Sequence, residues 1–172
     1  MKALLLLLAI FCFVALQCGC STVELKIGDK APSFGLLNQD GEIVHLSDFI
    51  GKKVALYFYP KDSTPGCTQQ ACSLRDSFDA LKAAGITILG LSKGSVRSKQ
   101  KFISKQHLTF PLLIATNKTL RDYGVNTGLF RLYLPKRWTF LIDENGIIVG
   151  IIKDVNTKNH AQQILNAFNA LK

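Results

Sequence analysis

The stretch VALYFYPKDSTPGC, residues 54–67, decides the fold. Its first six residues are apolar, aromatic or β-branched and Pro60 follows them, which predicts a buried central strand. Thr64 is a favourable N-cap and Pro65 suits a first helical position, so a helix is predicted to begin there. Cys67 would then lie in the first helical turn, beyond the carboxyl end of a strand, where α/β folds carry their sites.

Outward from this stretch, apolar runs alternate with helical patterns. We predict a hairpin of 34–37 and 43–46, further strands at 86–91, 110–114, 138–142 and 147–152, and helices at 65–84, 95–106, 118–123 and 158–171. This order, closed by a late hairpin, predicts an α/β fold with a mixed central sheet flanked by helices. The thioredoxin fold has that layout.

Length and composition indicate one globular domain. The chain has 172 residues, of which 48% are hydrophobic and 19% charged, and these values exclude a disordered protein. The net charge of +9 is dispersed, and its densest stretch places Arg97, Lys101 and Lys105 on one helical stripe. Because no aromatic side chains interleave with these charges to stack on bases, we interpret the stripe as a solvated helix face and expect no nucleic-acid partner.

The N-terminus has the pattern of an export signal. The run Ala3–Leu16 is apolar throughout, which matches a signal-peptide core and falls short of the roughly 20 residues of a membrane span. Cys20 follows a small residue just after this run, as in the lipobox of bacterial lipoproteins, and is the candidate for lipidation. A cleaved signal and an uncleaved anchor are the alternatives. We therefore expect a leader over 1–20, a folded domain over 21–172, and an extracytoplasmic location with membrane attachment only through the leader or its lipid.

Outside the leader the chain has two cysteines, Cys67 and Cys72. The free N–H groups and the positive dipole end of a helix start favour a thiolate at Cys67. The apolar stripe that continues from Cys67 through Leu74 indicates that this face packs against the sheet, with Cys72 about 100° away. As a merely buried small side chain, Cys67 would leave the upstream Pro and Thr unexplained.

These residues carry a family resemblance. The pattern Pro-x-x-x-Thr-x-x-Cys ending at Cys67 is similar to the active-site signature of the peroxiredoxins. The longer run 57–76 resembles the Q-type subfamily, also called bacterioferritin comigratory protein, and RWTFLID at 137–143 resembles a later segment of the same family. The resemblance extends from about residue 27 to residue 172 and implies a thioredoxin-like fold.

The resemblance also implies roles for individual residues. Cys67 matches the peroxidatic cysteine, and Thr64 matches the hydroxyl that hydrogen-bonds peroxide and thiolate. Arg137 matches the arginine that stabilises the thiolate and the departing oxygen, and Pro60 shields the sulfur from water. Cys72 matches the resolving cysteine, which implies a Cys67–Cys72 disulfide.

The implied function is that of a thiol peroxidase in antioxidant defence. It would reduce hydrogen peroxide and organic hydroperoxides to water and alcohols through a sulfenic acid at Cys67. Electrons would come from thioredoxin or a similar dithiol, and no metal, haem or flavin is expected as cofactor. The expected assembly is a monomer or weak dimer.

Two other functions fit the spacing of Cys67 and Cys72 less well. A thiol–disulfide oxidoreductase of this fold needs Cys-x-x-Cys, and a copper chaperone needs Cys-x-x-x-Cys with a distant His, whereas four residues separate the cysteines here. His45, His107 and His160 form no metal-ligand spacing with one another or with the cysteines, and we interpret them as structural or surface residues.

Overall fold

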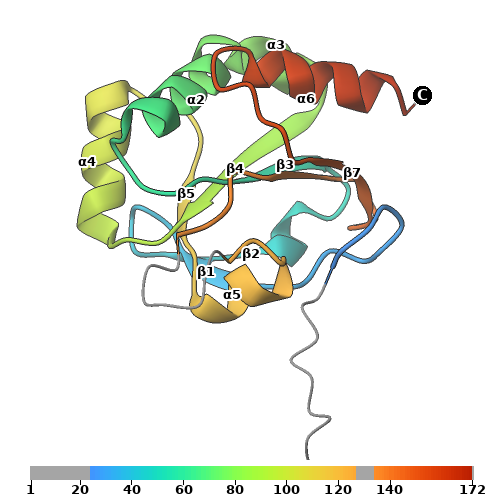
Figure 1. The fold of residues 1–172 in the computed structure, drawn as a ribbon, viewed down its shortest axis with the longest axis horizontal. Coiled ribbons are helices and arrows are strands. Elements are labelled where there is room, and N and C mark those ends of the chain that lie inside the picture. Colours follow the sequence, from blue (N-terminus) through green and yellow to red (C-terminus); the bar gives the residue numbers. More distant parts are fainter. Residues whose placement is uncertain (1–23, 127–133, 172) are drawn as a thin grey trace, which may run out of the picture.

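The structure is a computed structural model that describes residues 24–126 and 134–171 (Figure 1). The predicted leader and Cys20 lie outside these residues and stay predictions. The described part is a layered α/β arrangement in which helices lie above and below a central sheet (Figure 1).

Five strands form the sheet in the order β5–β4–β3–β6–β7. Their bounds are β3 Lys53–Phe58, β4 Ile86–Ser92, β5 Leu112–Ile114, β6 Thr139–Ile142 and β7 Ile148–Ile152. β3, β4 and β5 run parallel, while β6 is antiparallel to β3 and β7 is antiparallel to β6. The predicted mixed sheet is confirmed, and the strand predicted as central takes the middle position.

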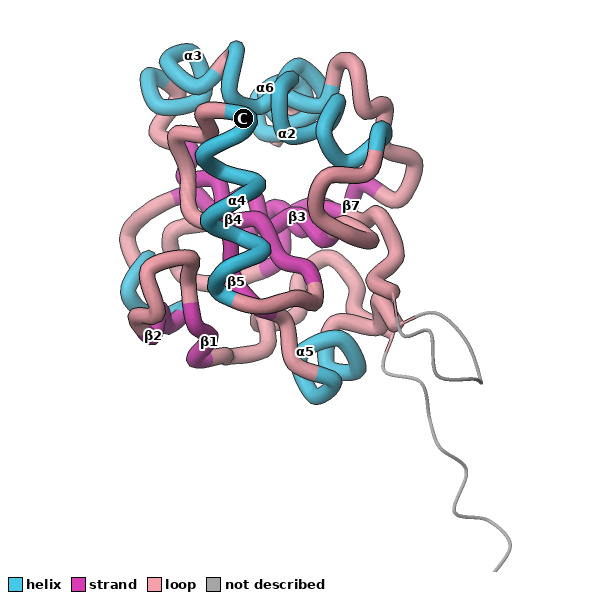
Figure 2. Tube along the Cα trace, turned by 90° about the vertical axis from the view of Figure 1, so that its left-hand side faces the viewer, coloured by secondary structure: helices cyan, strands magenta, loops and turns pink. Residues whose placement is uncertain are grey.

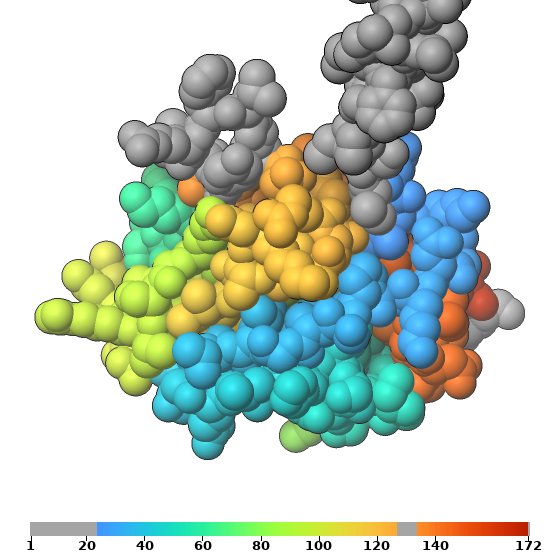
Figure 3. All heavy atoms as spheres, turned by 90° about the horizontal axis from the view of Figure 1, so that it is seen from below, coloured from blue at the N-terminus to red at the C-terminus, as the bar shows by residue number. Residues whose placement is uncertain are grey.

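Four helices cover one face of the sheet: α2 Pro65–Asp76, α3 Phe78–Ala83, α4 Val96–Gln106 and α6 His160–Asn169. The other face is covered by α5 Asn117–Asp122, the hairpin of β1 Gly35–Leu37 and β2 Ile43–His45, and a 3₁₀ turn, η1, Leu46–Phe49. Seen from that side, α5 and the hairpin lie against each other (Figure 3). α4 runs along the side of the molecule next to β4 and β5 (Figure 2).

Both faces of β3 are buried, which explains its continuous apolar sequence. Because successive strand side chains point to opposite faces, Leu56 and Phe58 join the cluster under the sheet. Ala55 and Tyr57 join the cluster beneath α2 and α6, which also contains Cys67. Cys67 therefore lies between the sheet and its helical layer.

The helix predicted over 65–84 is divided at Ser77. This residue leaves helical geometry, with φ −111° and ψ 16°, and its carbonyl accepts the N–H of Leu81 as α3 begins. Asp and Ser side chains compete with the helical backbone for hydrogen bonds, and Asp76 and Ser77 occupy the break. The apolar stripe persists across it, since Leu81 is fully buried.

The basic helix α4 carries one buried charge outside the predicted solvated stripe. Arg97, Lys101 and Lys105 are exposed, as expected for a solvated face. Lys99 is instead fully buried, because it lies three residues before Phe102 on the face that packs inward. A buried ammonium needs a counter-charge, and the loop before α2 supplies one.

Candidate active site

Cys67 lies in the first turn of α2, as predicted. Thr64 is the N-cap with extended backbone angles, and Pro65 is the first helical residue. The first helical hydrogen bond runs from the N–H of Thr68 to the carbonyl of Thr64, so the N–H groups of Gly66 and Cys67 have no acceptor within the helix. The thiol is free and its residue is 1% exposed.

Arg137 contacts the sulfur directly. It precedes β6, and its Nη2 donates to Sγ of Cys67 at 3.3 Å. A Cβ at Gly66 would lie 3.4 Å from the same Nη2, so the guanidinium lies close over the first helical turn. The guanidinium and the helix N-terminus both bring positive charge to the sulfur, an environment that stabilises a thiolate.

A buried hydrogen-bond chain holds Arg137 from behind. Its Nη1 donates to Oε1 of Gln70, and Nε2 of Gln70 lies 3.1 Å from Nδ1 of His160. Nε2 of His160 lies 2.9 Å from Oγ1 of Thr139. Burial, followed by the charge of Arg137, lowers the pKa of His160 to about 3, so the imidazole is neutral at physiological pH.

This chain is not apparent from the sequence. His160 was predicted to be a structural or surface residue, and the structure places it fully buried, hydrogen-bonded to Gln70 behind Arg137. Gln70 follows Cys67 by three residues, so helical spacing places both on one face of α2, and this spacing could have identified Gln70 as a neighbour of the site. No pattern near His160 identifies its partner, because 90 residues separate it from Gln70.

Tyr57 completes the surroundings of the histidine. It lies opposite Thr139 in the β3–β6 pair, and its ring meets the His160 ring edge-on, with centroids 6.0 Å apart. Burial, followed by the charge of Cys67, raises the pKa of Tyr57, so its hydroxyl stays protonated. Within the described part of the chain this hydroxyl is buried without a hydrogen-bond partner.

Thr64 and Pro60 lie in the loop that enters α2. The Thr64 hydroxyl donates to the carbonyl of Lys61 at 3.1 Å, and Pro60 is half-buried two residues after the end of β3. The roles implied for Thr64 and Pro60 at the sulfur therefore stay predictions, while Arg137 and Cys67 are brought into contact.

Cys72 lies on a different side of α2 from Cys67. It is half-buried, and its Sγ donates to Oε1 of Gln106 in α4 at 3.7 Å. Cys72 and Cys67 are both free thiols in this structure, within one continuous helix. The predicted resolving cysteine thus faces α4, and the predicted peroxidatic cysteine faces the sheet.

Asp62 anchors the loop before α2. Its Oδ1 accepts from the Tyr59 hydroxyl at 2.6 Å and forms an ion pair with Nζ of Lys99 at 2.9 Å, and its Oδ2 accepts from Ser98 at 2.8 Å. Burial lowers the pKa of Lys99, and Asp62 opposes that shift. The next residue, Ser63, has the left-handed φ of 60°, so the anchored carboxylate sits beside a strained backbone position.

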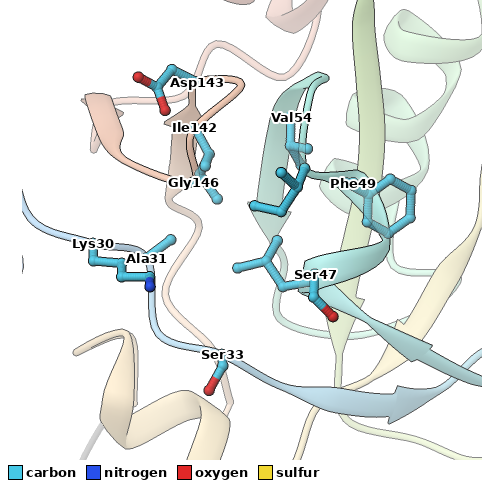
Figure 4. Close-up of a pocket in the computed structure, with 11 residues that line it drawn as sticks. Lys30, Ala31, Ser33, Ser47, Phe49, Val54, Ile142, Asp143 and Gly146 are labelled. Carbon is cyan, nitrogen blue, oxygen red and sulfur yellow. The ribbon is translucent and has the colours of Figure 1, made fainter.

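A separate cavity lies on the opposite face of the sheet. It has a volume of about 250 Å³ and is lined by residues that include Val54, Phe49 and Ile142 (Figure 4). Val54 and Ile142 belong to the cluster under the sheet, whereas Cys67 belongs to the cluster above it. This cavity is therefore no part of the cysteine site.

Comparison with known proteins identifies relatives along most of the chain. The profile of the AhpC/TSA family matches residues 27–151. Putative peroxiredoxin bcp of Coxiella burnetii is 42% identical over 148 residues, covering 83% of this chain and 98% of the relative. Peroxiredoxin Bcp of Escherichia coli K12 is 43% identical over 147 residues, covering 83% of this chain and 94% of the relative. The crystal structure of peroxidoxin BcpB from Mycobacterium tuberculosis superposes with a TM-score of 0.81 at 32% identity, covering 87% of this chain and 99% of that one.

The location predicted from the N-terminal run is wrong. We expected an extracytoplasmic protein attached to the membrane through residues 1–20. The family match begins at residue 27, and the Bcp relatives are matched over 94% and 98% of their own length, so the likeness is to proteins of the Bcp type and not to an anchored lipoprotein. Among the described residues, no helix is long and apolar enough to cross a bilayer.

The buried ion pair of Asp62 and Lys99 can be tested by measuring stability. Asp62→Ala leaves the Lys99 ammonium buried and unpaired, so we expect the free energy of unfolding to fall by about 3–5 kcal/mol. Lys99→Met costs less, because hydroxyl donors still satisfy the carboxylate. The double variant should then lose less than the sum of the single changes. Urea unfolding of the three variants measures these losses.

The exposed ion pair of Lys118 and Asp122 in α5 supplies the control. Lys118→Met should change the free energy of unfolding by less than about 1 kcal/mol. Additive losses in the Asp62→Ala and Lys99→Met double variant would contradict a coupled buried pair.

Proposed function

The chain belongs to the AhpC/TSA family, in its Bcp or peroxiredoxin Q branch, and we propose on this premise that it reduces hydrogen peroxide and organic hydroperoxides through Cys67. Membership of this family makes the protein a thiol peroxidase. One observation carries the assignment of the nucleophile: the 3.3 Å contact between Nη2 of Arg137 and Sγ of Cys67 at the start of a helix.

The first step is a two-electron displacement at oxygen. The Cys67 thiolate attacks one peroxide oxygen, an S–O bond forms and the O–O bond breaks. The sulfur is oxidised to a sulfenic acid, and the departing oxygen takes up a proton to leave as water or an alcohol. The guanidinium of Arg137 lies where it can stabilise both the thiolate and the charge on the departing oxygen.

We propose that Cys72 resolves the sulfenic acid. Its thiolate attacks Sγ of Cys67, an S–S bond forms, and the sulfenic oxygen leaves as water with one proton. Thioredoxin or a similar dithiol then returns two electrons and two protons and is itself oxidised to a disulfide. The cycle uses thiol groups only, so it calls for no metal, haem or flavin.

The assembly that we propose is a monomer or weak dimer. Cys67 and Cys72 both lie on α2 of one chain, so the proposed disulfide needs no residue from a second subunit. Arg137 comes from the same chain as well.

The proposed disulfide requires α2 to unwind. Five residues along an intact helix correspond to about 7.5 Å of rise and about 140° of rotation, which places the Cα atoms of Cys67 and Cys72 roughly 8–9 Å apart. A disulfide needs Cα atoms within about 7 Å and side chains that face each other. Here the two thiols face the sheet and α4, so resolution demands local melting between them.

Cysteine variants test the proposed roles. Cys67→Ser removes the nucleophile and should abolish peroxide consumption while the fold persists. Cys72→Ser should consume one equivalent of peroxide and then stop as a sulfenic acid when a thioredoxin-type dithiol is the reductant. Peroxide consumption and mass spectrometry of the protein measure both outcomes. Sustained turnover by Cys67→Ser would refute the assignment of the nucleophile.

Arg137→Lys tests the guanidinium. A lysine cannot donate to Cys67 and Gln70 at once in the same fixed geometry. The second-order rate with peroxide should fall at least about tenfold, equivalent to about 1.4 kcal/mol of barrier. Arg121→Lys, in α5 on the other face of the sheet, is the matched control and should leave the rate unchanged. Equal rates for both variants would exclude a direct role for Arg137.

Hydrogen exchange tests the unwinding. The oxidised protein should lose amide protection over residues 65–75, while β3 and β4 keep theirs, because only the helix has to open. Comparing reduced and peroxide-treated samples by mass spectrometry measures the change. Equal protection of 65–75 in both samples would exclude the disulfide between Cys67 and Cys72 and require an external thiol for resolution.

A further inference from the structure

The hydrogen bonds behind Arg137 have one direction only. A guanidinium donates and cannot accept, so Gln70 must present its carbonyl oxygen to Arg137. The amide NH₂ of Gln70 then points the other way, toward Nδ1 of His160. Nδ1 must therefore be an acceptor.

This direction fixes the tautomer of His160. A neutral imidazole that accepts at Nδ1 carries its proton on Nε2 and donates it there. Oγ1 of Thr139, 2.9 Å away, is in place to receive it. Burial and the nearby Arg137 charge keep the ring neutral, with a pKa of about 3, so the acceptor at Nδ1 is not lost to protonation near neutral pH.

We infer that His160 is a positioning residue for the peroxidase reaction, which holds the Gln70 amide in the orientation that aims Arg137 at Cys67. The inference rests on the proposed function of Arg137 and Cys67. It adds a residue from α6 to a site otherwise built from α2 and the start of β6. His160 touches neither the sulfur nor Arg137 through a hydrogen bond, and acts through Gln70.

The amide needs such a partner because its two ends have nearly the same shape. Turned about, Gln70 would present its NH₂ to the guanidinium, and two donors would face each other without an acceptor. Gln70 is fully buried, so water cannot satisfy the misplaced groups. An acceptor at Nδ1 of His160 satisfies the NH₂ of Gln70 in the orientation that turns the carbonyl oxygen to Arg137, and so favours that orientation.

The fold holds the imidazole in place on several sides. His160 is the first residue of α6, and the N–H of the following Ala161 lies 3.4 Å from Oγ of Ser73 on α2. The Tyr57 ring closes another side edge-on. The histidine therefore belongs to the contact between α6 and α2 and cannot turn without disturbing it.

The tautomer provides a test that is independent of activity. Nitrogen NMR of the reduced protein, with histidine labelled at both ring nitrogens, should show His160 as the neutral Nε2–H tautomer around neutral pH. A neutral Nδ1–H tautomer, or a protonated ring, would mean that Gln70 donates nothing to His160 and would overturn the inference. The tautomer of His160 can be measured in this way whether or not the protein consumes peroxide.

Two substitutions at His160 separate positioning from packing. Asn has a carbonyl oxygen at the level of Nδ1 and can still accept from Gln70, whereas Gln reaches to the level of Nε2 and retains only the contact with Thr139. We expect His160→Gln to lower the second-order rate with peroxide at least about tenfold, and His160→Asn to lower it by less than about threefold. His45→Gln, at an exposed histidine in β2, is the matched control and should have no effect.

The ultraviolet absorbance of the Cys67 thiolate at neutral pH, measured in a Cys72→Ser background, should fall more in His160→Gln than in His160→Asn. Equal rates and equal thiolate signals for His160→Asn and His160→Gln would overturn the inference and leave His160 a packing residue. Failure of the parent protein to consume peroxide would refute the proposed function, while the thiolate signal and the tautomer would still decide the role of His160. If either variant fails to fold, the tautomer of His160 measured in the parent protein decides whether the inference holds.

Discussion

The contact between the Arg137 guanidinium and the Cys67 sulfur is the interaction on which the rest of the site depends. Two distant segments must meet to make it: the helix that follows β3 and the residues that precede β6. They meet because β3 and β6 are neighbouring antiparallel strands, so the end of one lies beside the start of the other. The antiparallel pairing of β3 with β6 is thus what brings the guanidinium charge to the sulfur.

Two buried networks support this contact, one a hydrogen-bond chain that ends in a neutral side chain and the other an ion pair. The one behind Arg137 is neutral at its far end, because a protonated His160 could no longer accept from Gln70. The one under the loop is ionic, with Asp62 and Lys99 in a pair that is almost fully buried. A cation placed beside the loop complements a carboxylate, whereas a second cation behind Arg137 would repel the guanidinium. The network next to the Arg137 cation therefore ends in a neutral histidine, whereas the network next to the Asp62 carboxylate ends in a lysine cation.

The sequence was sufficient where the determinants are local. The apolar run and Pro60 predicted β3, and Thr64 with Pro65 predicted the start of α2 and hence the place of Cys67. It was insufficient where a partner lies far along the chain: the buried Lys99 is paired with Asp62, which lies 37 positions away. His160 was missed because a single histidine carries no sign of a partner on another helix. The predicted location is wrong because it rested on a local apolar run at residues 3–16, whereas the family likeness lies in the domain that is matched from residue 27.

The position of Gln70 links the two halves of the proposed cycle. It lies between Cys67 and Cys72, so the proposed unwinding that would bring the two sulfurs together would also remove Gln70 from Arg137 and His160. The arrangement that stabilises a thiolate would then be lost only at the proposed disulfide stage, when the sulfur is bonded and no thiolate remains. Asp62 lies upstream of the helix, with partners at Tyr59, just after β3, and at Lys99 on α4, so it can stay anchored while α2 opens. In the proposed cycle, reduction of the disulfide by a dithiol would let α2 refold from this fixed end, which would return Gln70 to His160 and restore the contact of Arg137 with Cys67 before the next peroxide arrives.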